Sequence, residues 1–127
     1  MIFATVGTQL PFDRMLSALD DWAARNIHMP VLAQTGASGA SFHTLKSVPR
    51  IDQKTFAEMI EKACVIVSHA GMGTILSAAE AGKRLIVMPR QAVFGEHRND
   101  HQLATAEEMA VLSNVTVVHD AQTLWDS

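Results

Sequence analysis

Residues 65–74, VIVSHAGMGT, place one histidine between a buried apolar run and a pair of closely spaced glycines. Gly71 and Gly73 let the backbone turn tightly and approach a ligand, and the expected helix after them offers unpaired N–H groups with a partial positive charge. A neutral His69 imidazole donating one N–H, together with the Thr74 hydroxyl, would complete a cradle for a diphosphate. The alternative is a plain strand-to-helix turn in which His69 caps a local carbonyl.

A second polar cluster, GEHRNDHQ, lies between an apolar strand and an apolar-faced helix. Asp100, His101 and Gln102 in a first helical turn can hydrogen-bond sugar hydroxyls, which need paired donors and acceptors. Asn99 and Gln102 also have the spacing of a capping box, which is the structural alternative for these two residues. The charges of the cluster are not explained by capping, so we predict a sugar-binding role.

A metal site is not expected at this cluster. His97 and His101 are four residues apart, a spacing that can serve a metal on one helical face. We expect the helix to begin between them, and the sequence offers no evident third ligand. No Asp-x-Asp pair is present to hold magnesium against a diphosphate. The sequence therefore predicts neither a metal nor another cofactor, and His97 is a candidate for substrate contact instead.

Three other places in the chain can contact the same ligand. Gly7 forms a second glycine turn after an apolar run, where Thr8, Gln9 and the backbone amides can touch a phosphate. The turn is neither a Walker loop nor a full dinucleotide fingerprint, and an ordinary strand-to-helix turn is its alternative. Arg90 can pair with an anionic ligand group or be a surface arginine. Glu80 can accept hydrogen bonds from ribose hydroxyls or be a solvated helix carboxylate.

Apolar runs rich in β-branched residues alternate with segments of helical period, which predicts an α/β fold with a mostly parallel sheet and helices on both faces. Ligands in open sheets of this kind bind beyond the carboxyl ends of the strands, where His69 is expected. Strands are predicted at 2–6, 31–34, 64–67, 85–88 and 115–118. Helices are predicted at 12–23 with Asn26 as a stop, at 56–63, 73–81 and 100–112, and from 123. Residues 35–49 are predicted to form a loop that can hold one short strand.

Composition limits the classes of function. A chain of 127 residues is the size of one domain, and we assign residues 1–127 to it. With 48% hydrophobic and 18% charged residues it should be globular, and a net charge of −3 argues against nucleic acid as a partner. The single cysteine, Cys64, and the absence of a signal peptide or membrane-spanning run indicate the cytosol, with any membrane contact made through a surface or a partner.

Taken together, VSHAGMGTILSAAEAGKRLIVMPR, GEHRNDHQLATAE and TVGTQLPFDRM resemble the C-terminal, sugar-nucleotide-binding domain of glycosyltransferase family 28. The resemblance covers nearly the whole chain and implies a Rossmann-like half of the GT-B fold. The most similar members are small stand-alone subunits of bacterial two-chain exopolysaccharide glycosyltransferases of the glucuronosyltransferase type. They are related in turn to the catalytic subunit of the eukaryotic two-chain N-acetylglucosaminyltransferase.

The resemblance implies that the diphosphate-binding motif consists of His69, Gly71, Met72, Gly73 and Thr74. Gly7 and Thr8 fall on the glycine turn that faces it, and Asp100, His101 and Gln102 on the donor-sugar motif. The sequence departs at Ser77, where many relatives carry a ribose-binding glutamate, and Glu80, one turn later, is the nearest substitute.

The resemblance also implies the chemistry and the partners. An acceptor hydroxyl attacks the anomeric carbon of a UDP-sugar donor with inversion, while His69, the glycine amides and the helix N-terminus stabilise the leaving diphosphate. The acceptor, a lipid-linked saccharide, would be bound by a membrane-associated partner subunit, which could also recruit this chain to the inner face of the membrane. Two alternatives are a non-catalytic nucleotide-sugar-binding module and an NAD(P)-binding oxidoreductase domain. The sequence argues against the oxidoreductase, because it contains no full glycine fingerprint followed about 20 residues later by an acidic residue.

Overall fold

A computed structural model of the chain describes residues 1–7, 10–36, 42–97 and 99–125. In this part of the chain six strands form one sheet with the order β3-β2-β1-β4-β5-β6, and every neighbouring pair is parallel. The strands are β1 Ile2–Thr5, β2 Val31–Gln34, β3 Lys46–Val48, β4 Val65–His69, β5 Arg84–Met88 and β6 Val115–Val117. The predicted mostly parallel sheet is confirmed, and the short strand expected between residues 35 and 49 is β3.

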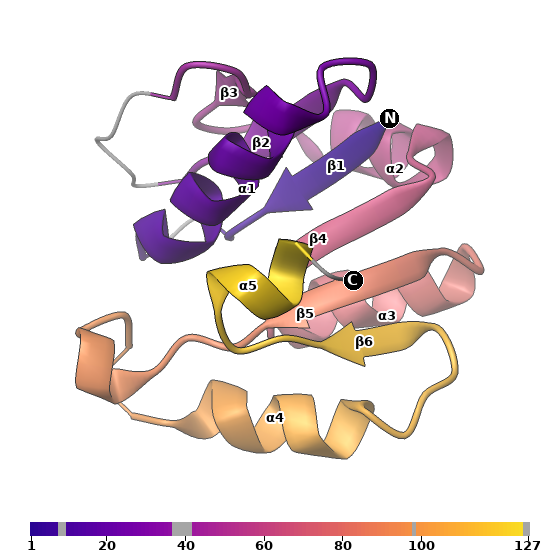
Figure 1. Cartoon of the computed structure of the whole chain (residues 1–127). Helices are drawn as coiled ribbons and strands as arrows, with labels where there is room; N and C mark the ends of the chain where they lie inside the picture. The colour runs from indigo at the N-terminus through magenta and orange to yellow at the C-terminus, as the bar shows by residue number, and fades with distance from the viewer. Residues whose placement is uncertain (8–9, 37–41, 98, 126–127) are drawn as a thin grey trace.

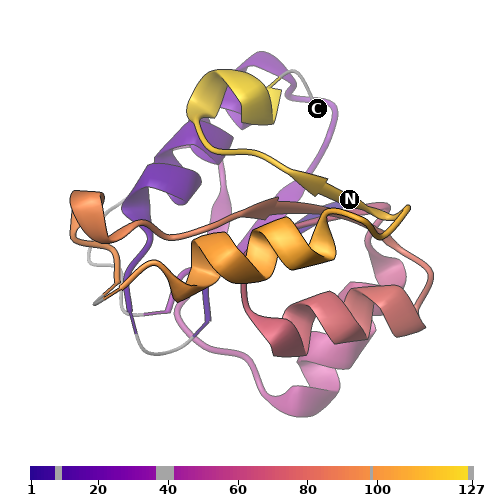
Figure 2. The same cartoon turned by 90° about the horizontal axis from the view of Figure 1, so that it is seen from below.

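Helices cover both faces of the sheet (Figures 1 and 2). The helices are α1 Asp13–Arg25, α2 Gln53–Lys62, α3 Met72–Glu80, α4 His101–Met109 and α5 Ala121–Trp125, with a 3₁₀ turn at Ala92–Phe94. Helices α1 and α5 lie on one face, and α2, α3 and α4 lie on the other. The prediction of a Rossmann-like sheet with helices on both faces is therefore confirmed.

The alternation of side chains along each strand supplies one core per face. In β1, Ile2 and Ala4 join the core under α1 and α5, while Phe3 points to the opposite face and meets Phe56 of α2 edge-on at 5.6 Å. Successive side chains of a strand point to opposite faces, so a strand buried on both sides reads as an uninterrupted apolar run. This is why the four central runs could be recognised in the sequence.

Helix α4 is shorter than predicted. The apolar spacing extends the expected helix to Leu112, whereas the helix ends at Met109. Val111 is 86% exposed, and Leu112 is 38% exposed. These two residues continue the helical pattern but are not part of the buried core, and most helical stability in proteins comes from tertiary packing rather than from propensity.

Asp20 ties α1 to the chain segment before β3. It is buried, and its carboxylate accepts hydrogen bonds from the backbone N–H groups of His43, Thr44 and Leu45 at 2.9 to 3.1 Å. Burial raises the pKa of Asp20, but the three N–H donors and the nearby His43 outweigh it and hold this pKa below its usual value. The carboxylate therefore contributes stability in its ionised form.

We expect Asp20→Asn to lower the free energy of unfolding by about 1 to 2 kcal/mol at pH 7, because the amide NH₂ would face a backbone donor. The pKa of Asp20 is lower in the folded chain than in the unfolded chain. The extra stability of the wild type over Asp20→Asn is therefore fully present above the ordinary aspartate pKa of 3.8, and it is lost as the pH falls through the pKa of the folded chain. Urea unfolding from pH 3 to pH 7 measures both effects. Asp21→Asn, at the exposed neighbouring position, is the control; an equal loss there would contradict the role given to Asp20.

The strand order reverses direction between β1 and β4, which pair directly from Ile2 with Val65 to Thr5 with Ser68. At such a switch point the connections leave toward opposite faces of the sheet, and a crevice opens at the carboxyl ends of the two strands. Gly7 follows β1 at this crevice, and His69 is the last residue of β4. The topology thus brings two sequence-predicted residues to one place.

Candidate functional site

The ring of His69 lies between the two glycine turns. A Cβ atom placed on Gly7 would be 3.2 Å from Nε2 of His69, and one on Gly71 would be 2.7 Å from Nε2 and 2.5 Å from Cε1. Gly7 also has a φ of +78°, a conformation that side-chain-bearing residues rarely adopt. Both glycines are therefore needed for the ring to lie where it does, and Nε2 faces the gap between them.

Arg90 is a buried cation rather than a surface arginine, with 4% of its surface exposed. One terminal nitrogen contacts Nδ1 of His69 at 2.9 Å, and the other donates to the carbonyl oxygens of Val6 and Leu10 at 2.5 and 2.6 Å. Its guanidinium also lies over the ring of Phe12 at 5.2 Å. No carboxylate among the described residues forms an ion pair with Arg90. Its positive charge is therefore not neutralised by direct contact within this part of the chain.

Gln102 joins the ends of β4 and β5. Its Oε1 accepts hydrogen bonds from the backbone N–H groups of Ala70 at 3.3 Å and Arg90 at 3.0 Å, and its Nε2 lies 3.2 Å from Nδ1 of His69. The side chain is buried at 8% exposure. The capping box with Asn99 is not formed, because the amide points into the interior. The predicted contact of Gln102 with a donor sugar remains a prediction, and both ends of its amide contact protein groups here.

The protonation state of His69 follows from its surroundings. Burial, then the positive charge of Arg90, then the electrostatic effect of His97 lower the pKa of His69 to about 4. The imidazole is therefore neutral at pH 7, as the sequence interpretation assumed. A neutral ring carries one N–H and one lone pair, and can donate one hydrogen bond to a ligand.

Helix α3 begins beside the ring. Gly71 is its N-cap, and the N–H groups of Met72, Gly73 and Thr74 make no hydrogen bond within the described residues. Such unpaired donors and the helix dipole favour an anion. Apart from its chain neighbours and the backbone of its own helix, a Cβ placed on Gly73 would meet no described atom within 4 Å, so this glycine is not required by packing. Thr74 is buried at 8% exposure and Met72 is half exposed at 46%.

His69, Arg90 and Gln102 line a pocket of about 230 Å³ together with Val6, Gly7, Leu10 and His97. Two of its buried polar atoms, Nε of Arg90 and Nδ1 of His97, have no hydrogen-bond partner among the described residues. Buried polar atoms are nearly always paired, so unpaired ones next to a pocket indicate where a ligand or water can bind. The sequence-predicted residues His69, Gly7, Arg90, His97 and Gln102 thus come together.

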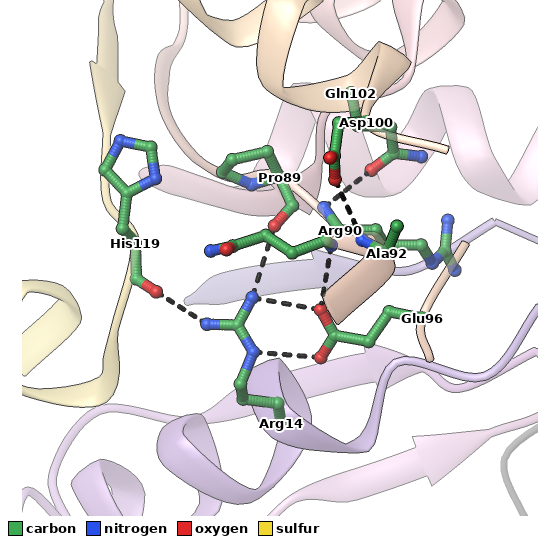
Figure 3. Close-up of polar contacts among 9 residues, drawn as sticks. Arg14, Pro89, Arg90, Ala92, Glu96, Asp100, Gln102 and His119 are labelled. Carbon is green, nitrogen blue, oxygen red and sulfur yellow. Dashed lines mark hydrogen bonds and ion pairs between the residues drawn. The ribbon is translucent and has the colours of Figure 1, made fainter. Parts of the chain in front are cut away.

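The remaining residues of the polar cluster organise the loop before α4. Asp100 accepts a hydrogen bond from the backbone N–H of Ala92 at 2.9 Å, and Asn99 accepts one from the N–H of His101 at 3.0 Å (Figure 3 shows the first of these). Helix α4 starts at His101, so His97 precedes it, and the His101 side chain is exposed. Asp100 and Asn99 therefore have structural partners, while the imidazole of His101 remains available to a ligand.

Glu80 is not brought together with His69. It is exposed at the end of α3 and lines a separate groove of about 770 Å³ between α2 and α3, which also contains Ser77. Helix α3 begins at the carboxyl ends of the strands, beside the switch point. Its last residue, Glu80, therefore lies toward the amino ends of the strands. The ribose contact assigned to Glu80 stays a prediction. Thr8 and Gln9 lie outside the described residues.

Arg14 and Glu96 form a clamp that the sequence interpretation missed (Figure 3). Arg14 donates to both carboxylate oxygens of Glu96, at 2.9 and 3.0 Å, and to the carbonyl oxygens of His119 and Pro89 at 2.6 and 3.2 Å. Glu96 also accepts from the backbone N–H of Gln91 at 3.1 Å. The clamp joins α1 to the loops after β5 and β6, and so fixes the segment that begins with Arg90. Two charged residues 82 positions apart give no local signal.

The described residues include no group of three or more His, Cys, Asp or Glu side chains placed to hold a metal. None of the helices in the described ranges is long and apolar enough to cross a membrane.

A parallel sheet of this order, with donors converging at its switch point, defines a Rossmann-like α/β domain whose crevice is in the usual ligand position of the class. The family follows from the sequence comparison. The chain belongs to the glycosyltransferase family 28 C-terminal domain family, whose model matches residues 1–124. No curated protein matches the sequence.

Solved structures with a similar fold include glycosyltransferases. The glycotransferase of kitacinnamycin is 22% identical with a TM-score of 0.67, and the match covers 95% of this chain and 30% of that one. The glycosyltransferase SnogD from Streptomyces nogalater is 19% identical with a TM-score of 0.52, over 97% of this chain and 32% of that one. The chain thus spans about a third of the length of these structures, and its fold is that of a GT-B half-domain, as predicted.

Proposed function

We propose that this chain binds a UDP-sugar by its diphosphate at the β1–β4 switch point and is the donor-binding subunit of an inverting glycosyltransferase. One observation carries the proposal: Nε2 of His69 lies beside Gly71, the N-cap of α3, and the other ring nitrogen contacts a buried arginine that has no carboxylate partner among the described residues. Such a site favours an anion with several oxygen acceptors. Family membership supports a sugar nucleotide as that anion.

The same groups would serve catalysis. As the glycosidic bond to the donor breaks, negative charge builds on the leaving diphosphate, so fixed donors stabilise the transition state more than the bound donor. The donors of this site are rigidly placed because His69 is held by Arg90 and Gln102. No protein group needs to reorganise when the charge develops, which is the condition under which such donors are most effective.

The acceptor half of the enzyme is proposed to be a separate chain. The solved relatives are about three times longer than the part that this chain matches, which leaves room in them for a second half-domain. We propose that a membrane-associated partner binds a lipid-linked saccharide acceptor, and that the pair acts in exopolysaccharide synthesis. Glucuronic acid is one donor sugar that the sequence resemblance suggests. This separation of donor and acceptor binding is tested by measuring sugar transfer from a panel of UDP-sugars, with and without the partner subunit, for which the product of the neighbouring gene is the first candidate. Full transfer activity of the chain alone would refute it.

Calorimetry tests the diphosphate site directly. We expect UDP to bind the wild-type chain, and His69→Ala to weaken it about tenfold, which is the loss of roughly one hydrogen bond to a charged group. His28→Ala, at an exposed histidine remote from the pocket, is the control and should bind UDP as the wild type does. Unchanged UDP affinity in His69→Ala would remove His69 from the site.

The same measurement separates the alternatives. Binding of NAD instead of UDP would favour an oxidoreductase domain, which shares this strand order. Binding of UDP without any transfer in the presence of the partner would favour a non-catalytic nucleotide-sugar-binding module.

A further inference from the structure

Nδ1 of His69 faces two hydrogen-bond donors. A terminal nitrogen of Arg90 is 2.9 Å away, and Nε2 of Gln102 is 3.2 Å away. An arginine guanidinium has only N–H groups and cannot accept a hydrogen bond. Nδ1 must therefore present its lone pair to Arg90, whatever the orientation of the glutamine amide.

The orientation of Gln102 is decided by its other contacts. Its Oε1 lies 3.3 and 3.0 Å from two backbone N–H groups, those of Ala70 and Arg90, which can only donate. Exchanging the oxygen and nitrogen of the amide would place NH₂ against two donors inside the protein. Amide orientation has to be assigned from such a network, and here the network permits one choice. The NH₂ group of Gln102 is therefore the second donor to Nδ1.

We propose that Arg90 and Gln102 are positioning residues that hold His69 in the tautomer with its proton on Nε2. That N–H then points into the gap between Gly7 and Gly71, and Nε2 makes no hydrogen bond within the described part of the chain. The other tautomer would turn a lone pair toward the same gap and repel an anion. His69 thus works as a fixed neutral donor, and Gln102 acts through the ring.

The charged groups around the ring support this arrangement. Arg90 from the segment after β5 and His97 from the loop before α4 are the titratable groups that act on His69, and both lower its pKa, after the larger effect of burial. A proton on Nδ1 would meet the Arg90 cation directly. The contacts that set the tautomer are present in the chain without any ligand. Only the role of the Nε2 N–H as a donor to UDP rests on the proposed function.

Nitrogen-15 NMR of the imidazole rings in the wild-type chain tests the tautomer without any variant. The chain has six histidines, and loss of one ring signal in His69→Ala assigns that of His69. We expect the proton on Nε2 between pH 5.5 and pH 8, with no titration of this ring in that range. A proton on Nδ1, or an ordinary titration near pH 6.5, would overturn the proposal.

Gln102→Glu tests the positioning role. A carboxylate keeps acceptors for the Ala70 and Arg90 amides but replaces the neutral donor beside Nδ1 by a negative charge, so the His69 pKa should rise. Arg90, which can only donate, should keep the proton of the neutral ring on Nε2. Gln53→Glu makes the same change at an exposed site on α2 and should leave the ring unchanged. A His69 ring that keeps its pKa in a folded Gln102→Glu chain would contradict the role of Gln102. If that variant does not fold, the wild-type spectrum still decides the tautomer.

UDP affinity then distinguishes positioning from a general structural effect. The ratio of the Gln102→Glu and wild-type dissociation constants should be about tenfold at pH 8, where the ring is neutral, has lost the Gln102 donor and lies beside an uncompensated carboxylate. It should shrink toward unity as the pH falls and the ring becomes an imidazolium with a proton on both nitrogens. Taking the ratio at each pH removes the titration of UDP itself. A constant ratio would contradict the proposal, whereas failure of the wild type to bind UDP would refute the proposed function and leave the tautomer standing.

Discussion

Arg14→Met should lower the free energy of unfolding by about 2 to 3 kcal/mol, as expected when one partner of a largely buried ion pair is removed. Glu96 is 10% exposed and would keep only the Gln91 N–H as a donor among the described residues. The carbonyl oxygens of His119 and Pro89 would also lose their guanidinium donors. Methionine retains the length of the side chain against Phe94, so the loss reflects hydrogen bonds and charge. Urea unfolding with a fixed m-value measures it.

Arg84→Met is the matched control. Arg84 is exposed at the start of β5 and has no side-chain hydrogen bond among the described residues, so its replacement should change stability by no more than about 0.5 kcal/mol. If Arg14→Met lowered stability no more than Arg84→Met does, the clamp would not stabilise the fold. A loss of UDP affinity in Arg14→Met at a temperature where it stays folded would show that the clamp also positions Arg90.

Alanine at Gly71 and at Gly73 should have opposite effects on stability. Gly71→Ala places a Cβ 2.5 Å from the His69 ring, which Arg90 and Gln102 hold from the other side, and we expect a loss of about 1 to 3 kcal/mol. The backbone at Gly71 has a φ of −97°, which alanine tolerates, so the cost comes from the contact alone. Gly73→Ala meets nothing within 4 Å and should gain about 0.5 to 1 kcal/mol as a better helix former.

Both variants should nevertheless weaken the binding of UDP. Gly71→Ala displaces the ring that carries the donor, and Gly73→Ala puts a methyl group where the diphosphate is proposed to approach the helix amides. A tenfold or greater increase in the UDP dissociation constant is expected for each, measured by calorimetry alongside thermal unfolding. A Gly73→Ala chain that is more stable and binds UDP normally would move the diphosphate away from this helix turn. Unchanged stability in Gly71→Ala would mean that the ring is not confined.

The fold could be predicted because a parallel sheet buried on both faces leaves continuous apolar runs, and this chain places four of them between helical segments. Residues 31–34 were predicted to the residue, whereas β4 extends two residues further than expected, to His69. The reason is that Ser68 and His69 pair with β5 as strand residues although neither is apolar. Polar residues at a strand end break the pattern without ending the strand.

The part of the site that could be predicted consists of residues that are close together in the sequence. His69 and its glycines form one continuous motif, and their convergence with Gly7 follows from a strand order typical of the class. The burial of Arg90 and Gln102 could not be read in advance, because both residue types are usually exposed and their partners come from distant segments. Arg14 with Glu96 is the same case, since a contact across 82 positions has no periodicity to detect.

The position of β1 in the middle of the sheet has a consequence for how the protein is made. Of the six strands of this sheet, β1 leaves the ribosome first, and it pairs with β2 on one side and with β4, more than 60 residues later, on the other. Synthesis at about 5 to 20 residues per second leaves Gly7 waiting roughly 3 to 12 s for His69 to be translated. Until then the edge of β1 that will form the crevice is an unpaired strand edge, which is prone to wrong pairing. We therefore expect the site to be among the last parts of the nascent chain to form, because pairing across such a sequence separation is slow.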